Sequence, residues 1–212
     1  MTNTALDNDL LIKGACYWLL PEILEATGST TTTCGVLGAA KYVCANALMN
    51  RGLKDALDCL IKLLNELVLL DPSETEASIA AEIELEAQRS GLNLDVGESI
   101  LFAIVSVRNI PVLATGDKRA IAAIEKIVIE RHQQEFWSER VLCLEQIIRR
   151  ILGHTDPISV RDRICAAPTA DKSLAICFSC AGGTGDADAW ISGLNSYIAA
   201  IRKIAPAVLA PN

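Results

Sequence analysis

Residues 92–119 read LNLDVGESILFAIVSVRNIPVLATGDKR, and this stretch decides the fold. Asp95 and Glu98 precede the apolar run 100–105, which predicts a buried helix that opens on two acids. Residues 111–115 predict a short buried strand, and Asp117 follows it. A helix start and a strand end that both carry carboxylates are typical of the crevice at one edge of an open α/β sheet.

A third acidic group lies near the beginning of the chain. Asp7 and Asp9 follow a predicted first strand at residues 2–6. Neither His nor Cys accompanies these three acidic groups, so the ligand atoms on offer are all oxygen. Oxygen ligands suit hard divalent cations such as Mg²⁺ or Mn²⁺. The three acidic groups therefore suggest an all-oxygen site for a divalent cation.

On both sides of residues 92–119, hydrophobic periodicity and turn residues predict alternating strands and helices, which is the pattern of the α/β class. The further strands are expected at 34–37 and 68–70, and the further helices of this region at 10–20, 38–50, 53–65, 71–90 and 118–129. Beyond residue 130 the pattern changes to helices at 139–152, 157–166 and 186–204, with 172–179 open to either structure. These observations predict an α/β domain over 1–129 and a helical C-terminal extension over 130–212 that packs on it.

Three motifs in order resemble the PIN-domain family: Asp7-Asn-Asp-Leu-Leu, Asp95-Val-Gly-Glu98 and Thr115-Gly-Asp117-Lys. The resemblance covers about residues 1–128. It implies a three-layer α/β/α sandwich with a short parallel sheet and a Mg²⁺- or Mn²⁺-dependent nuclease of the toxin or RNA-processing kind. Asp7, Asp95, Glu98 and Asp117 would be its catalytic and metal-binding residues, with Asp9, Thr115 and Lys118 in secondary roles.

Two other interpretations stay open. Asp95 and Asp117 also suit the N-caps of their helices, where carboxylates are favoured. The family usually carries a further acid on the helix after the second strand, but residues 38–50 contain no Asp or Glu. Glu82 or Glu86 could take the place of this missing acid. This departure favours a degenerate PIN-like domain that acts as a non-catalytic binding or regulatory module. A metal-dependent phosphatase is disfavoured, because Asp7-Asn-Asp9 lacks the partners expected of that class.

Composition narrows the partners and the compartment. A net charge of -7 and a pI near 4.9 argue against a general basic coat for nucleic acid. The expected substrate is single-stranded RNA, while an antitoxin-like protein partner and a homodimer are left open. The longest apolar run, at 100–107, is too short to span a membrane, and the first residues do not resemble a signal peptide.

The 8 cysteines lie mostly in apolar stretches, which predicts free buried thiols and a cytoplasmic protein. Cys177 and Cys180 have the spacing of a zinc or redox motif. No second pair and no nearby His completes four ligands, so a structural role is favoured. The glycine-rich residues 182–185 lack the Lys-Ser/Thr of a phosphate-binding loop and are expected to be a connector.

Overall fold

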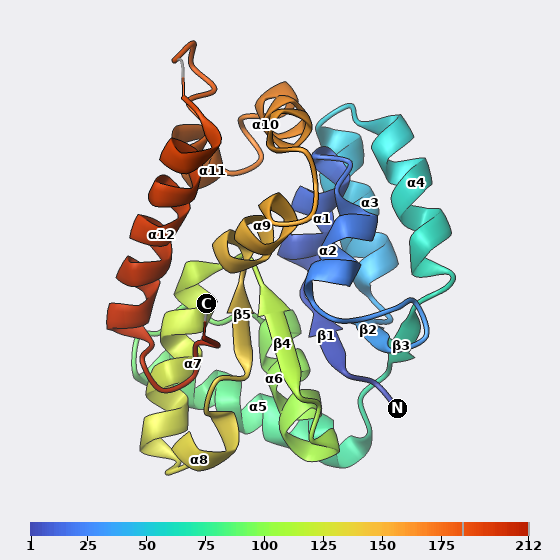
Figure 1. Ribbon diagram of the computed structural model, residues 1–212. Helices are drawn as coiled ribbons and strands as arrows, with labels where there is room; N and C mark the ends of the chain where they lie inside the picture. Colours follow the sequence, from blue (N-terminus) through green and yellow to red (C-terminus); the bar gives the residue numbers. More distant parts are fainter. Residues whose placement is uncertain (184, 212) are drawn as a thin grey trace.

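Five parallel strands form a single sheet with the order β3-β2-β1-β4-β5 (Figure 1). The computed structural model describes residues 1–183 and 185–211. Each strand is short, and all but the edge strand β3 are mostly buried, as expected when helices cover both faces of a parallel sheet. The strands are β1 (Thr4–Leu6), β2 (Cys34–Leu37), β3 (Val68–Leu70), β4 (Val112–Thr115) and β5 (Val141–Cys143).

Helices form the two outer layers of an α/β/α arrangement, and the described residues contain twelve. Within that part of the chain, none is long and apolar enough to cross a membrane. The helices are α1 (Asn8–Cys16), α2 (Leu20–Ala26), α3 (Ala40–Asn50), α4 (Lys54–Leu64), α5 (Glu74–Arg89), α6 (Val96–Arg108), α7 (Lys118–Glu130), α8 (Gln134–Trp137), α9 (Leu144–Leu152), α10 (Pro157–Ala166), α11 (Lys172–Cys177) and α12 (Ala187–Ile204).

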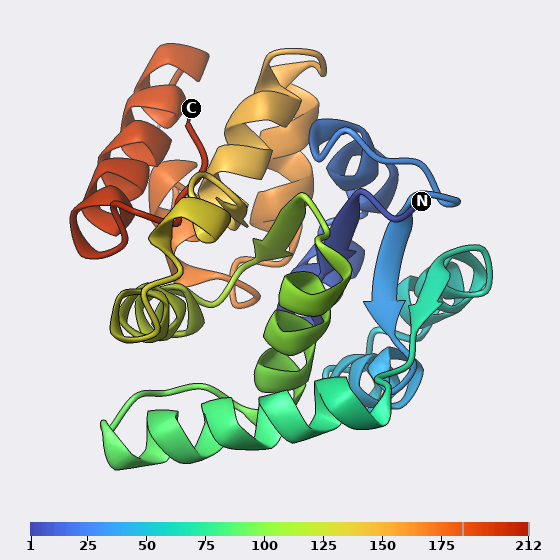
Figure 2. The same ribbon diagram turned by 90° about the horizontal axis from the view of Figure 1, so that it is seen from below.

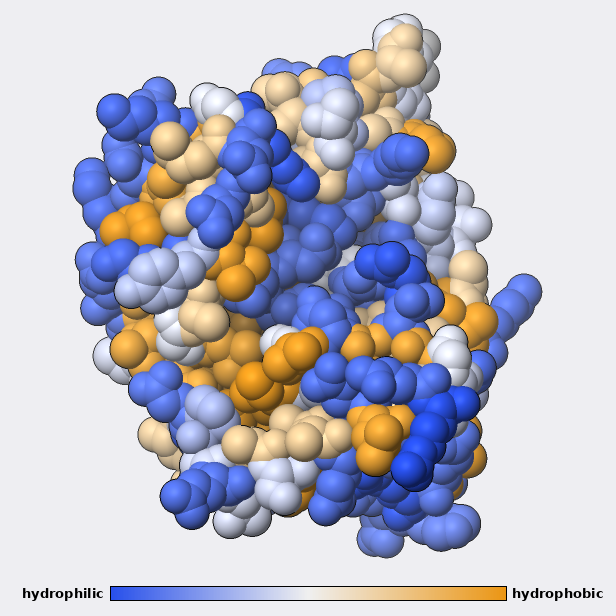
Figure 3. All heavy atoms as spheres, turned by 180° about the vertical axis from the view of Figure 1, so that it is seen from behind, coloured by the Kyte–Doolittle hydropathy of each residue, from blue (hydrophilic) through white to orange (hydrophobic). Residues whose placement is uncertain are grey.

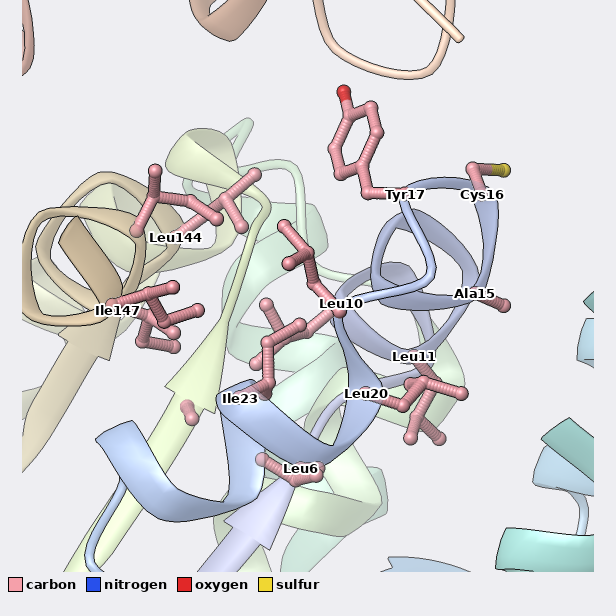
Figure 4. Close-up of a cluster of buried hydrophobic side chains, with 14 of the residues drawn as sticks. Leu6, Leu10, Leu11, Ala15, Cys16, Tyr17, Leu20, Ile23, Leu144 and Ile147 are labelled. Carbon is pink, nitrogen blue, oxygen red and sulfur yellow. The ribbon is translucent and has the colours of Figure 1, made fainter. Parts of the chain in front are cut away.

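Alternate residues of each strand point to opposite layers. In β4, Leu113 packs with α5, α6 and α7, whereas Ala114 packs with α1, α2 and α9. Ala5 and Leu6 divide in the same way in β1. Figure 2, seen from below, shows α5 and α6 together on one side of the sheet. Figure 4 shows part of the other core, in which Leu10 and Leu144 approach each other from α1 and α9.

The C-terminal segment completes the sheet and covers its edge. β5 pairs with β4, and the backbone of Val141 bonds to both Val208 and Ala210 of the final residues. Helix α12 lies beside this edge, with Leu194 in one core and Ile198 in the other (Figure 1). The proposed division at residue 129 stays a prediction, but one strand of the sheet comes from beyond it.

Two predicted helices differ from the structure. The helix expected over 139–152 begins only at Leu144, because Val141–Cys143 is strand β5. The helix expected over 10–20 ends at Cys16, and Trp18 turns the chain with a positive φ of 57°. Pro21 lies in the first turn of α2, where its missing N–H costs no hydrogen bond.

The expectation that all cysteines are free is wrong for one pair. Cys165 and Cys180 form a disulfide with their Cα atoms 5.0 Å apart, while Cys177 is a buried free thiol. Cys177 and Cys180 therefore play different parts, and the bond joins the end of α10 to the turn after α11. The predicted connector 182–185 includes Thr184, which lies outside the described residues.

Candidate functional site

The strand order reverses at β1, and this reversal places the site. From β1 the chain builds β2 and β3 on one side, and then crosses to β4 and β5 on the other. Ligands of open α/β sheets bind at the carboxyl ends of the strands beside such a point. The backbone N–H of Asp7, just after β1, donates to the carbonyl of Ala114 in β4 at 3.0 Å. The ends of β1 and β4 therefore meet at one edge of the sheet.

Asp7 and Thr115 contact each other directly at this edge. The Thr115 hydroxyl donates to Oδ2 of Asp7 at 2.9 Å, and Oδ1 accepts from the backbone N–H of Asn8 at 2.7 Å. Burial raises the pKa of the Asp7 carboxyl to about 6, although the bond from Thr115 lowers it. Asp7 is also the N-cap of α1, and Asp9 lies in the first turn of that helix.

Asp95 and Glu98 form a reciprocal capping box at the start of α6. Oδ1 of Asp95 accepts from the backbone N–H of Glu98 at 2.8 Å, and Oε2 of Glu98 accepts from that of Asp95 at 2.8 Å. A Cβ on Gly97 would lie 3.9 Å from Nδ2 of Asn8. The first turns of α6 and α1 are therefore neighbours, which brings the capping box to the end of β1.

The pKa of Glu98 depends on the other predicted site residues. Burial raises its pKa to about 8; the hydrogen bond from Asp95 lowers it, and the charges of Asp95, Asp7 and Asp117 raise it. A like charge nearby disfavours the ionised form of a carboxyl group, so Asp95, Asp7 and Asp117 all act on Glu98 in the same direction.

Glu98 also borders two adjoining hollows. The face of the molecule seen from behind in Figure 3 is hollowed near its centre, and hydrophilic residues gather around the hollow. A small inner hollow is bordered by Glu98, Asp7, Thr115 and apolar side chains. The outer one is open to solvent and is lined by Leu92, Asn93, Leu94, Asp95, Glu98, Asp117 and Arg119.

Asp117 is the N-cap of α7, as the capping interpretation predicted. Its Oδ1 accepts from the backbone N–H of Arg119 at 2.7 Å and from Nε of the same residue at 3.2 Å. Its Oδ2 accepts from Nη2 of Arg119 at 2.7 Å. The pKa of Asp117 is lowered: burial would raise it, but the bonds and charge of Arg119 outweigh that.

Lys13 lies behind the turn between Thr115 and Asp117. Its ammonium is 2.6 Å from Oδ2 of Asp9 and 2.9 Å from Oδ2 of Asp171, and it donates to the carbonyl of Gly116 at 3.2 Å. A Cβ on Gly116 would meet Oδ2 of Asp9, so a larger residue here would displace the carboxylate that pairs with Lys13. Asp9 thus neutralises Lys13 beside the site.

Lys118 is also engaged. Its ammonium lies 2.6 Å from Oε1 of Glu145 and donates to the Ser173 hydroxyl at 2.6 Å, above the ring of Tyr197. Glu145 is only 1% exposed, so Lys118 balances a buried carboxylate. Of the two alternatives for Lys118, phosphate binding or charge balance, this geometry favours charge balance.

Sequence reasoning missed Glu145, Asp171 and Ser173, all from the C-terminal segment. Asp171 could have been noticed as a helix N-cap, and it does cap α11 by accepting from the N–H of Leu174 at 3.0 Å. Glu145 could have been noticed as the one acidic residue among the apolar residues of α9. Glu86, a suggested substitute for the missing acid, pairs instead with Arg131 at 2.8 Å.

The donor types at the site fit Mg²⁺ or Mn²⁺, but their present arrangement is not a preformed ion site. Among residues 1–183 and 185–211, no three His, Cys, Asp or Glu side chains are placed to hold one ion together. The capping box engages Asp95 and Glu98, and Arg119 engages both oxygens of Asp117. A cation would have to draw these side chains out of their present bonds.

Known proteins offer no further guide to this arrangement: no protein-family model, curated protein or solved structure matches the chain.

Proposed function

We propose that this chain is a PIN-like, Mg²⁺- or Mn²⁺-dependent ribonuclease that hydrolyses single-stranded RNA. The observation that carries the proposal is the outer hollow lined by Asp95, Glu98 and Asp117, next to the inner hollow that Glu98 and Asp7 border. The raised pKa of Glu98 supports it. Perturbed carboxylates in a crevice are typical of catalytic sites. Their position at the strand-order reversal adds a second, independent reason.

In this function the chain itself has three tasks. The Thr115 hydroxyl fixes the orientation of the Asp7 carboxylate. The first turns of α6 and α7 present Asp95, Glu98 and Asp117 toward the outer hollow. A divalent cation bound there supplies the activation of water and the neutralisation of charge that phosphodiester hydrolysis needs.

Calorimetric titration with Mn²⁺ tests the site. The wild type should bind Mn²⁺, and Glu98→Gln should bind it at least tenfold more weakly, while Glu130→Gln, exposed at the end of α7, should match the wild type. Saturation to a hundred times the dissociation constant should stabilise the wild type by about 2.7 kcal/mol. Absence of Mn²⁺ binding by the wild type would contradict the proposal.

Cleavage tests the chemistry separately. Purified protein in Mn²⁺ should cleave single-stranded RNA, and Asp95→Asn should abolish cleavage. Asn keeps a cap at α6, so the loss would not reflect unfolding of that helix. Melting curves of both proteins in EDTA provide the control for folding.

The second candidate is a degenerate PIN-like module that binds without catalysis. Two observations favour it: α3 carries no carboxylate, and Arg119 engages both oxygens of Asp117. Metal-independent binding of RNA by a protein that cleaves none of a diverse RNA set would establish this second function instead.

A further inference from the structure

Arg119 is the cation nearest to the outer hollow whose side chain remains largely in solvent. The Arg119 side chain is 72% exposed, and that of Asp117 is 22% exposed. The guanidinium of Arg119 donates from Nε to Oδ1 of Asp117 and from Nη2 to Oδ2 of Asp117. Its guanidinium has no other partner in the described part of the chain.

The other two cations of this region are not free to bind a ligand. Lys13 is nearly buried between Asp9 and Asp171, and Lys118 is held by Glu145 and Ser173. Removing either lysine from its partners would leave a buried carboxylate unpaired, which is costly. Breaking the exposed pair of Arg119 costs far less, because water solvates both groups once they separate.

Arg119 and a cation compete for Asp117. Oδ1 of Asp117 already accepts two bonds from Arg119 and Oδ2 accepts one, and the guanidinium charge repels a cation that approaches the same carboxylate. A cation that recruits Asp117 therefore frees the guanidinium at the rim of the hollow. A freed guanidinium suits a phosphate group, since its planar fork matches two phosphate oxygens.

We propose that Arg119 is a positioning residue that exchanges partners: it holds Asp117 in the metal-free protein and binds a phosphate of the RNA once a divalent cation takes Asp117. This inference rests on the proposed function and deepens it. The exchange makes cation binding and RNA binding cooperative, because each removes a competitor of the other.

Arg119→Gln tests both halves of the exchange, and Lys126→Gln is the matched control. Lys126 is exposed two turns further along α7 and loses the same charge. In titrations with Mn²⁺ alone, Arg119→Gln should bind about two- to fivefold more tightly than the wild type, since a competing exposed ion pair is gone. The control should equal the wild type.

Binding of a short fluorescent oligoribonucleotide, measured in Ca²⁺ to suppress cleavage, tests the second half. Arg119→Gln should bind it about tenfold more weakly. Its plot of log affinity against log salt should be shallower by about 0.7, the loss of one phosphate contact on a single strand. Arg119→Lys should keep the slope and lose part of the affinity, because the charge remains without the fork.

A wild type that binds Mn²⁺ together with an Arg119→Gln variant whose Mn²⁺ affinity, RNA affinity and salt slope are unchanged would overturn the exchange and leave the proposed function intact. A wild type that binds no Mn²⁺ would overturn both. Weaker Mn²⁺ binding by Arg119→Gln would also overturn the exchange, because it would make Arg119 a support for the cation rather than its competitor.

Discussion

Lys13 is held by three oxygen partners in a nearly buried position. Its side chain is 11% exposed and its ammonium contacts two carboxylates and one carbonyl. Removing one partner from such a cluster leaves uncompensated buried charge. Lys13→Met should therefore lower the free energy of unfolding by about 3–5 kcal/mol, as measured by urea denaturation.

A double variant separates charge from packing. Asp171→Asn added to Lys13→Met removes one of the two carboxylates left unpaired, so it should recover part of the lost stability. Lys126→Met, exposed on α7, is the control and should change stability by less than about 0.5 kcal/mol. Strictly additive losses in the double variant would show that the cluster acts only through packing.

Glu98 should give the stability of the protein a pH dependence of unusual sign for a carboxyl group. Its pKa rises from the usual 4.5 to about 8 in the folded protein. Between these values the folded chain keeps a proton that the unfolded chain has released, so the contribution of Glu98 to stability is lost as pH rises through this window. Above about pH 8 the loss is complete.

Glu98→Gln removes the part of this dependence that Glu98 contributes and keeps an oxygen for the capping box. In EDTA it should match the wild type near pH 4.5 and exceed it by about 1–2 kcal/mol at pH 9, after allowance for screening by water. Urea unfolding at both pH values measures the difference. An equal difference at both pH values would contradict the raised pKa.

At the residue scale the sequence predicts local contacts well and distant ones poorly. Helix caps at Asp95 and Asp117 follow from neighbouring residues, and both are present. The pair of Lys13 with Asp171 joins residues far apart in the chain, and no pattern in the sequence links them. The grip of Arg119 on Asp117 depends on one side-chain rotamer, which a sequence does not specify.

At the scale of elements, strands bounded by clear turns were predictable. The polar loop before Cys34 and Gly38 after Leu37 bound β2, and it occupies the predicted residues. The strand β5 was missed because Val141–Cys143 runs directly into α9, and its apolar residues fit the helical period. No turn residue separates the two elements.

The disulfide should stabilise the pair α10 and α11. Cys165 and Cys180 are separated by 15 residues, and closing a loop of that size restricts the unfolded chain by about 3 kcal/mol. Reduction with dithiothreitol should therefore lower the free energy of unfolding by about 2–3 kcal/mol. Urea denaturation with and without the reductant gives the value.

The double variant Cys165→Ala/Cys180→Ala supplies the control for reduction. It should be less stable than the oxidised wild type and insensitive to dithiothreitol. Alkylation followed by mass spectrometry should find this pair protected in the unreduced protein and the exposed Cys59 modified. Modification of Cys165 or Cys180 without reduction would contradict the bond.

At the scale of the whole molecule, the last residues are part of the core. Leu209 is fully buried, and the Glu125 carboxylate accepts the backbone N–H groups of Ala207 and Val208. Leu209→Ala should cost about 2–5 kcal/mol, the usual loss for a buried leucine. Ile129→Ala, 46% exposed on α7, should cost much less. Equal losses in urea denaturation would contradict the packing of the tail.

The α/β class followed from alternating strand and helix patterns, but the strand order did not. Periodicity shows which residues are buried and leaves open which strand each one neighbours. The contact of β1 with β4 brings Asp7 to Thr115 across more than a hundred residues, so the site depends on topology. The three motifs indicated which residues meet, while their bonds required coordinates.

The contact between Lys13 and Asp171 also orders events during translation. Chains emerge from the ribosome N-terminus first at about 5–20 residues per second, so roughly 160 residues and about 8–30 seconds separate these two partners. The nascent chain carries Asp9 and Lys13 long before the second carboxylate exists. The turn at Gly116 therefore gains its full support only after Asp171 has been synthesised.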